Sequence, residues 1–178
     1  MTWKTHVAGG VVAGTALINA ALYDSFSVSL APVSLRDAGV VLALSVLGSM
    51  TPDIDLTTTK TGRAVKPVSW VINRFFGHRT ICHAPLLYLL LCFGLSAFYP
   101  NAALFVYAFT AGAFSHIVLD MLNKKGIPVF YPISKHFHLL SISATNGKGE
   151  KIVRWSLYAA ALALLFRTGF TYYEVYFG

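Results

Sequence analysis

Charged side chains are scarce in this sequence, and that scarcity decides its class. Only 12% of the residues are charged, while 56% are hydrophobic and 14% are aromatic. Soluble domains usually carry about 25% charged residues. The composition therefore excludes an ordinary soluble domain and is typical of an integral membrane protein. Internal repeats and low-complexity linkers are also lacking, so we expect one membrane domain over residues 1–178.

Cysteine and acidic residues are few as well. Cys82 and Cys92 are the only cysteines and stand ten residues apart on one expected helix, which argues against a disulfide framework. The 7 acidic residues face 14 Lys and Arg, which gives a formal net charge of +7. Such an excess suggests nucleic acid in a soluble protein, but membrane proteins concentrate Lys and Arg in their cytoplasmic loops. The positions of these residues must decide.

Five apolar segments are candidates for membrane helices, since a bilayer crossing requires roughly 20 apolar residues. They are residues 5–23, 35–50, 84–98, 102–122 and 152–171. The second and third are short and either extend into neighbouring residues packed inside protein or enter only part of the membrane. We therefore expect an all-α bundle of four to five transmembrane helices with loops at its cytoplasmic face.

The first segment has a rival interpretation as a cleavable signal peptide, because "MTWK" precedes an apolar run of small residues. Gly9, Gly10 and Gly14 favour a retained helix instead, since small residues let membrane helices approach closely.

Lys and Arg are distributed very unevenly between the two sides of this bundle. With the N-terminus inside, Arg36 and Arg167 lie outside. The inner set is Lys4, Lys60, Arg63, Lys66, Arg74, Arg79, Lys124, Lys125, Lys135, Lys148, Lys151 and Arg154. The positive-inside rule therefore predicts a multi-pass protein with a cytoplasmic N-terminus and two cytoplasmic loops. The positive charge is explained by topology, and no nucleic-acid partner is expected.

The two long loops differ in character. Residues 64–77 contain "AVKPVSWVINRFFG", in which apolar and aromatic residues alternate with basic ones, and this pattern predicts an interfacial amphipathic helix beginning near Pro67. Residues 123–151 contain "GIPVFYPIS" and "ATNGKGE", which are rich in turn-forming residues. We expect this second loop to form an ordered cap with a flexible tip.

Imidazoles and carboxylates gather at the expected cytoplasmic ends of four helices. They are His6, Asp53, Asp55, His78, His83, His116 and Asp120. His116 and Asp120 are four residues apart on a helix and so share a face, and ionisable residues at such depth normally point into the bundle. Their convergence predicts a metal-binding or proton-relay site.

Two further polar pairs precede the third expected helix. Asp53 and Asp55 in "PDID" would point the same way in an extended segment, where two carboxylates repel unless a cation intervenes. His78 and His83 would not share a helix face, so we place His78 on the entering loop and His83 in the first turn. Arg79 suits a carboxylate or an oxyanion.

Each of these residues also has an ordinary structural explanation. A histidine at a membrane face is usually an interfacial side chain, which is our interpretation of His136 and His138. His6 alone would be a polar helix start, and Asp53 or Asp55 alone a cap or turn residue. The functional interpretation rests on their occurring together.

The motifs "THVAGG", "GSMTPDID", "HRTICH", "HIVLD" and "GIPVFYP" follow one another from Thr5 to Pro132. In this order they resemble the YdjM-like family of inner-membrane proteins, to which a metal-dependent hydrolase activity is ascribed. The resemblance implies a divalent-metal site formed by the same seven His and Asp residues, and location in the inner membrane. The chain departs from the family's "HRGxTHS" pattern at Thr80, Cys82 and Ala84, so a hydroxyl that would orient a ligand is missing.

The expected activity is hydrolysis of a phosphoester or related bond in an amphiphilic or lipid substrate at the cytoplasmic interface. Mixed His and Asp ligation favours Zn²⁺, with Mn²⁺ or Fe²⁺ as alternatives and one or two ions bound. The expected metal ligands are Asp53, Asp55, His83, His116 and Asp120. His6 and His78 are expected either to complete a second metal site or to act as acid and base in catalysis. Arg79 is expected to stabilise transition-state charge, and Lys124, Lys125 and Lys135 to hold an anionic headgroup.

Two alternatives are left open. The same cluster could bind a metal in a non-enzymatic scaffold that docks a cytoplasmic protein, as the family's link to a cytoplasmic repressor implies. A closed zinc site needs only four ligands, and the surplus of candidates favours catalysis. A transporter with a His and Asp relay ranks last, because the outer halves of the helices carry few polar residues.

Overall fold

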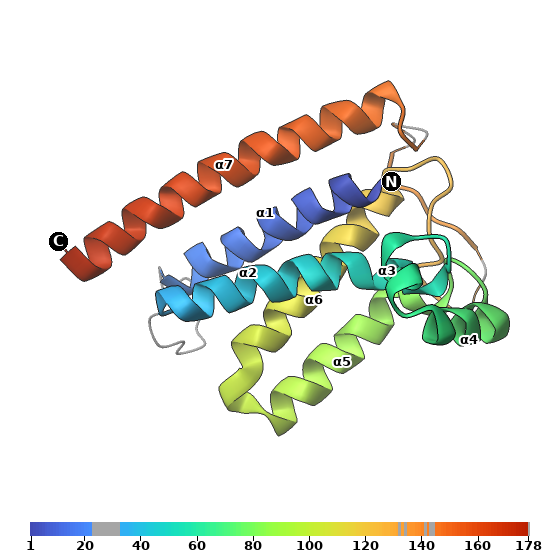
Figure 1. Cartoon of the computed structure of the whole chain (residues 1–178), viewed down its shortest axis with the longest axis horizontal. Coiled ribbons are helices and arrows are strands. Elements are labelled where there is room, and N and C mark those ends of the chain that lie inside the picture. Colours follow the sequence, from blue (N-terminus) through green and yellow to red (C-terminus); the bar gives the residue numbers. More distant parts are fainter. Residues whose placement is uncertain (23–32, 132, 134, 141, 143–144, 178) are drawn as a thin grey trace.

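The computed structural model describes residues 1–22, 33–131, 133, 135–140, 142 and 145–177 as an all-helical membrane bundle (Figure 1). The α-helices are α1 (Trp3–Leu22), α2 (Leu35–Met50), α3 (Lys60–Ala64), α4 (Lys66–Phe76), α5 (Pro85–Phe98), α6 (Ala103–Met121) and α7 (Lys148–Phe177). Three 3₁₀ turns join them: η1 (Thr51–Asp55), η2 (Ile81–His83) and η3 (Pro100–Ala102). The fold class predicted from composition is confirmed.

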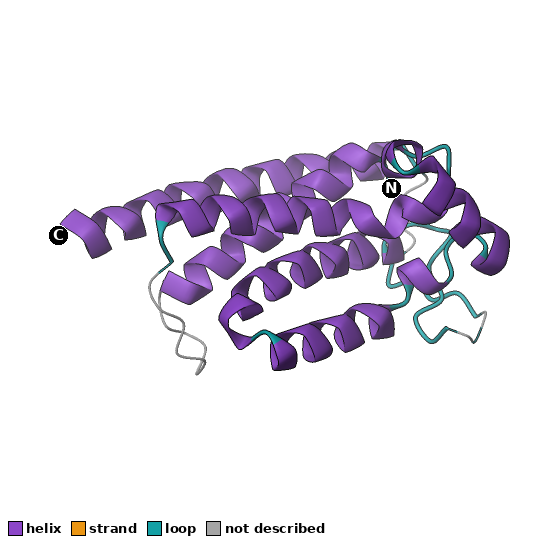
Figure 2. Cartoon of the chain, turned by 60° about the horizontal axis from the view of Figure 1, so that its bottom comes forward, coloured by secondary structure: helices purple, strands orange, loops and turns teal. Residues whose placement is uncertain are grey.

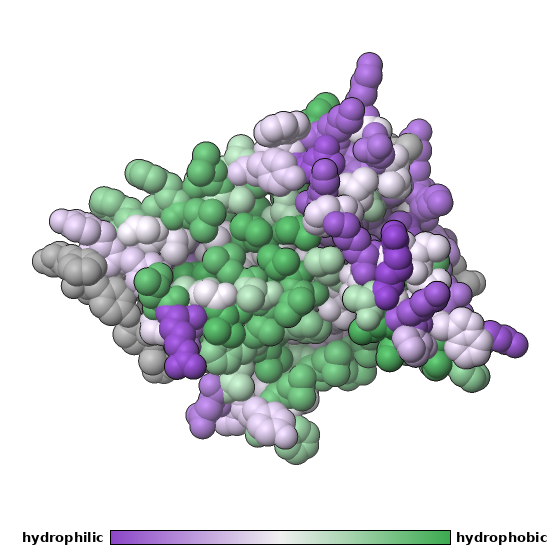
Figure 3. Space-filling model, in the orientation of Figure 1, coloured by the Kyte–Doolittle hydropathy of each residue, from purple (hydrophilic) through white to green (hydrophobic). Residues whose placement is uncertain are grey.

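The long helices run side by side, with the small helices gathered at one end (Figures 1 and 2). We call this the polar end: α1 and α7 begin there, and α2 and α6 finish there. The opposite end, where α1 finishes and α2 begins, we call the apolar end. Figure 3 shows hydrophilic residues concentrated over the polar end and a broad hydrophobic surface over the long helices. An apolar exterior of this kind is suited to lipid.

Glycines allow α1, α2 and α6 to pack backbone against backbone. A Cβ added at Gly48 would lie 2.0 Å from the Phe109 carbonyl oxygen, and one at Gly112 would lie 1.9 Å from that of Ser45. Without a large hydrophobic driving force between helices in lipid, association depends on such close packing. The approach of α2 to α6 brings the ends of these two helices together at the polar end.

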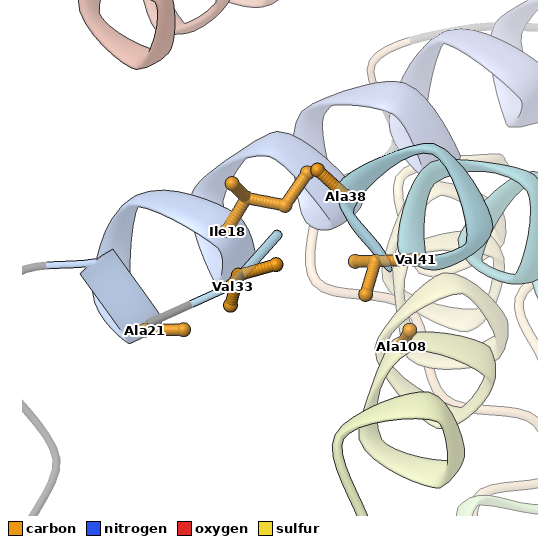
Figure 4. Packing of buried hydrophobic residues seen from close by; sticks show 6 residues of the cluster. All are labelled: Ile18, Ala21, Val33, Ala38, Val41 and Ala108. Atoms are coloured by element: carbon orange, nitrogen blue, oxygen red, sulfur yellow. The ribbon is translucent and has the colours of Figure 1, made fainter. Parts of the chain in front are cut away.

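The apolar end is held by small aliphatic side chains. Ile18, Val33, Ala38, Val41 and Ala108 are buried against one another between α1, α2 and α6 (Figure 4). The hydroxyl of Tyr172 on α7 donates a hydrogen bond of 2.7 Å to the Val33 carbonyl and ties the last turns of α7 to this end.

Three helical segments are long and apolar enough to cross a membrane among the described residues: Trp3–Leu22, Leu35–Asp55 and Pro100–Met121. They match the first, second and fourth predicted segments, although Tyr23, predicted as the end of the first, lies outside the described residues. α5 is apolar but has 14 residues, a length of about 21 Å at the helical rise of 1.5 Å per residue, short of the roughly 30 Å hydrocarbon core. α7 is the longest helix, and residues such as Trp155, Leu162 and Phe166 on it are exposed.

The predicted amphipathic segment is helical, although it is divided in two. Thr59 caps the start of α3, since its hydroxyl accepts a hydrogen bond from the Gly62 amide, and α4 follows with Pro67 in its first turn. On α4 Val68, Trp70 and Phe75 are exposed while Ser69 is buried. Its placement in the membrane interface stays a prediction.

The segment between α6 and α7 has no helix among its described residues. An antiparallel bridge joins Ile127 to Phe137, and Ile127 packs with Tyr88 and Ile117 beneath it. This part of residues 123–151 therefore covers the polar end, as an ordered cap would. Residues 132, 134, 141, 143 and 144 of the predicted loop lie outside the described residues.

Candidate metal centre

The predicted convergence of imidazoles and carboxylates is present in the structure. His6 lies on α1, Asp53 and Asp55 on η1, and His116 and Asp120 on the last turns of α6. His78 and Arg79 lie in the turn after α4, and His83 closes η2. All of these elements meet at the polar end.

Two groups of three side chains have ligand atoms within 4.8 Å of one another. The first is His6, Asp53 and His116, and the second is His83, His116 and Asp120. The rings of His6 and His116 are stacked, with centroids 3.6 Å apart. Asp55 and His78 belong to neither group.

The contact of His116 with α2 fixes which of its nitrogens can bind a metal. Nδ1 lies 2.7 Å from the Ser49 carbonyl oxygen, and because a carbonyl only accepts, Nδ1 carries the proton. Nε2 therefore presents a lone pair, 3.8 Å from Asp53 Oδ1 and 3.9 Å from Asp120 Oδ2. His116 can give one ligand atom to one ion.

The carboxylate of Asp120 lies between the two groups. Its Oδ1 is 3.4 Å from His6 Nε2 and also contacts the Met1 amino group. Its Oδ2 is 2.9 Å from an Arg79 guanidinium nitrogen and 3.8 Å from His83 Nε2. Asp120 therefore offers one oxygen to each side of the centre.

Asp55 is buried behind His83. Its Oδ1 lies 2.8 Å from His78 Nδ1, and its Oδ2 accepts a hydrogen bond of 2.8 Å from the Arg79 amide. The same Oδ2 lies 3.3 Å from His83 Nδ1, so that His83 Nε2 faces Asp120. A carboxylate behind an imidazole in this way orients a metal ligand. Direct ligation by Asp55 stays a prediction.

The expectation that Asp53 and Asp55 point the same way is wrong. The "PDID" segment forms the 3₁₀ turn η1 instead of an extended strand, and residues two apart in a 3₁₀ helix are about 240° apart. Asp53 consequently faces His116, whereas Asp55 faces His78 and His83. The loop position of His78 is as expected. The expectation that His83 lies in the first turn of the following helix is wrong, because His83 ends the 3₁₀ turn η2 and α5 begins only at Pro85.

Arg79 has a backbone conformation that is uncommon for a residue with a side chain. Its φ is +59°, and such positions cluster at functional sites. Its backbone amide donates to Asp55, and its guanidinium contacts Asp120 and donates a hydrogen bond of 2.9 Å to the Gly126 carbonyl. Arg79 thus connects η1, α6 and the cap.

The chemistry of these donors fits a divalent cation. His6 Nδ1, His83 Nε2 and His116 Nε2 are buried, and each lacks a hydrogen-bond partner among the described residues. Burying such groups unpaired is costly, and two or more imidazoles with one carboxylate form a familiar zinc ligand set. Burial raises the pKa of the Cys82 thiol to about 12, which disfavours the thiolate in the metal-free protein.

Glu150 holds the first turn of α1 and was missed by the sequence analysis. Its Oε1 accepts hydrogen bonds of 2.6 Å from the Thr2 amide and from the hydroxyls of Thr2 and Thr5. Burial alone would raise its pKa, but these bonds and one from the Asn146 amide lower the pKa to about 2. The carboxylate thereby fixes the turn that precedes His6.

A cavity of about 280 Å³ opens from the centre. His6 and Asp53 form part of its wall, and Trp3, Lys60 and Arg63 form another part. The predicted headgroup-binding residues are not among its lining: Lys124, Lys125 and Lys135 are exposed elsewhere. The run "LTTTKTGR" immediately after "PDID" could have signalled the two cationic residues that do line it.

A helical membrane bundle with a buried His and Asp centre at one end is the class of protein that this fold and site define. The sequence model of the family described as "YdjM inner membrane protein" matches residues 1–175. The chain belongs to this family and is an inner-membrane protein.

Two relatives show how far the similarity extends along the chain. The chain is 33% identical to the Bacillus subtilis protein named "Uncharacterized protein YvsG", over 86% of this chain and 87% of the relative. It is 34% identical to the "Inner membrane protein YdjM" of Escherichia coli, over 56% of this chain and 53% of the relative. No solved structure matches the chain.

Proposed function

We propose that this protein is a membrane-embedded, metal-dependent hydrolase that cleaves a phosphoester or related bond of an amphiphilic substrate at the cytoplasmic face. One observation carries the proposal: buried imidazole nitrogens without partners lie beside two carboxylates and open onto a cavity. A closed structural site would have no need of the cavity or of more than four ligands.

The orientation in the membrane is part of the proposal. The segments that carry the twelve Lys and Arg residues assigned to the inside all belong to the polar end or its connections. Under the positive-inside rule this end faces the cytoplasm.

The residues divide into ligands and supporting groups. His83, His116 and Asp120 would hold one ion, with Zn²⁺ expected from the mixed donor set. A second ion would require His6, Asp53 and the other oxygen of Asp120, because His116 has one free nitrogen. Asp55 would orient His83. The bound cation would supply Lewis-acid polarisation of the phosphoryl oxygen and a water of lowered pKa.

The remaining groups handle charge and protons. In hydrolysis water adds to phosphorus, the ester P–O bond breaks, and the leaving alcohol takes up a proton. The guanidinium of Arg79, already beside Asp120, would stabilise the charge that develops on the phosphoryl oxygens. His78, paired with Asp55 and partly exposed, is positioned to exchange protons with solvent and so to supply the leaving group.

Turnover tests the proposal. Purified protein in detergent is incubated with Zn²⁺ or Mn²⁺ and a panel of phospholipids and polyprenyl phosphates, and released phosphate or headgroup is measured. Product should depend on the metal and fall to background in His83→Ala, while His138→Ala, at an exposed position outside the centre, should match the wild type. Tightly held metal without product across the panel would contradict the hydrolase and favour the scaffold.

A further inference from the structure

Two cavities of different character meet at Trp3. The first is the 280 Å³ cavity of the metal centre, and the second, of about 420 Å³, lies between α1 and α7. The second cavity is lined by Lys4, Val7, Ala8 and Val11 of α1 and by Tyr158 and Ala161 of α7, and Trp3 lines both cavities. The polar cavity of the metal centre and the mainly apolar cavity between α1 and α7 therefore adjoin at the indole of Trp3.

Two cationic side chains line the polar cavity together with the candidate ligands His6 and Asp53. Lys60 and Arg63 are exposed, and neither forms an ion pair with a carboxylate among the residues that the structure describes. The Lys60 ammonium lies 3.5 Å from the centre of the Trp3 ring. Arg63 donates a hydrogen bond of 3.1 Å to the Thr58 carbonyl through Nε, which leaves its terminal nitrogens available for an anion.

The apolar cavity follows the direction of a lipid chain. It extends along α1 from Trp3 to Val11, a distance of about 12 Å at the helical rise. Ala8 and Ala161 are small and almost fully buried on its walls, so a side chain longer than alanine would fill the space. Figure 1 shows α7 running beside α1 along this length.

We propose that the two cavities together bind one lipid that ends in a phosphate monoester. The phosphate lies between Lys60, Arg63 and the metal centre, the hydrocarbon chain lies in the α1–α7 groove, and Trp3 marks the junction. This inference rests on the proposed function, because it names the substrate class of the same site. A dianionic phosphate matches two cations and a metal, and a groove open to the bilayer suits a substrate that does not leave it.

The binding experiment uses Trp3 as its probe. In a Trp70→Phe, Trp155→Phe background, Trp3 is the only tryptophan. Its fluorescence is measured in nanodiscs that contain phosphatidic acid with brominated chains, and in matched nanodiscs with brominated phosphatidylcholine. We expect selective quenching by phosphatidic acid, because only its headgroup draws a chain into the groove. Equal quenching by the two lipids would overturn the proposal.

Charge variants test the headgroup position. Lys60→Ala with Arg63→Ala should weaken phosphatidic acid binding at least fivefold, with the metal content unchanged. Lys66→Ala with Arg74→Ala removes the same charge from neighbouring α4, and its affinity should stay within twofold of the parent. If the two double variants bind alike, Lys60 and Arg63 do not form the headgroup site.

Groove variants test the chain position and separate a lipid from a soluble phosphate. Ala161→Phe should abolish selective quenching, while Leu162→Phe, at the adjacent exposed position, should not. Val7→Phe fills the groove from α1 and replaces Ala161→Phe if that variant does not fold. Glycerol 3-phosphate should compete at least tenfold less well than phosphatidic acid. Unchanged quenching in the groove variants, or equal competition, would overturn the chain site.

The outcomes also separate this inference from the proposed function. Selective binding without turnover would leave the lipid site standing and defeat the hydrolase. Metal-dependent turnover that is insensitive to both sets of variants would leave the hydrolase standing and defeat the lipid site.

Discussion

The two ends of the bundle use the same helices for different purposes. At the apolar end, Ile18, Val41 and Ala108 make non-directional contacts that would tolerate similar side chains. At the polar end, the hydrogen bond from His116 Nδ1 to the Ser49 carbonyl fixes the ring proton on Nδ1 and the orientation of the imidazole. The apolar end therefore contributes to the stability of the bundle alone, whereas the polar end also determines what it can bind.

A pair of alanine variants should show the largest difference between the roles of the two ends. His116→Ala removes the residue shared by both ligand groups and should leave the dialysed protein without stoichiometric metal. Ile18→Ala at the apolar end should keep the metal but lose about 2–5 kcal/mol of stability, the usual cost of such a truncation in a core. Atomic absorption and thermal unfolding measure both quantities. Metal retained by His116→Ala would contradict the assignment.

Substitution of a glycine between α2 and α6 should lower both the stability of the bundle and its affinity for metal. Gly112→Ala places a Cβ 1.9 Å from the Ser45 carbonyl oxygen, so α2 and α6 must separate one turn before His116. We expect a loss of about 1–3 kcal/mol or more from overpacking, together with weaker metal binding. Gly94→Ala, where nothing lies within 4 Å, is the matched control. Equal unfolding temperatures for the two variants would show that the close contact is unimportant.

A smaller effect is expected from the carboxylate behind His83. Asp55→Asn keeps the shape but weakens the orientation of the imidazole, and such changes cost about 10–100-fold in metal affinity. Competition with a fluorescent zinc chelator measures the affinity. A complete loss of metal, equal to that of His116→Ala, would indicate instead that Asp55 is itself a ligand.

The smallest effect, and one that depends on pH, is expected at Glu150. Glu150→Gln weakens the hydrogen bonds to Thr2 and Thr5 and should cost about 1–3 kcal/mol at neutral pH. Because folding lowers the pKa of Glu150 from 4.5 to about 2, its contribution is present above pH 4.5 and is lost as the pH falls towards 2. Denaturant unfolding of both proteins from pH 7 to pH 3 should show the difference shrinking. A constant difference would contradict the account.

Much of the polar end could be predicted because topology constrains it. A side chain that is costly in lipid must lie at a helix end or inside the bundle, so the segments carrying His6, Asp53, His83 and His116 had to converge once the helices were assigned. Long apolar runs likewise predicted the membrane helices. The count of spans was less secure, since four to five were predicted and, among the described residues, three segments are both long and apolar enough for a full crossing.

The details that the sequence did not reveal depend on tertiary contacts. The directions of Asp53 and Asp55 follow from a 3₁₀ turn that replaces the expected extended segment. Lys60 resembles any topology-determining lysine until Trp3 is found beneath its ammonium. Glu150 meets Thr2 across 148 positions of sequence, and no local pattern predicts such a contact.

X-ray absorption spectroscopy at the zinc edge of the purified, zinc-loaded protein tests the central claim most directly. The account predicts a first shell of nitrogen and oxygen only, with the multiple scattering of at least two imidazoles, and its loss in His116→Ala. A first shell containing sulfur, or a spectrum unchanged in His116→Ala, would contradict it.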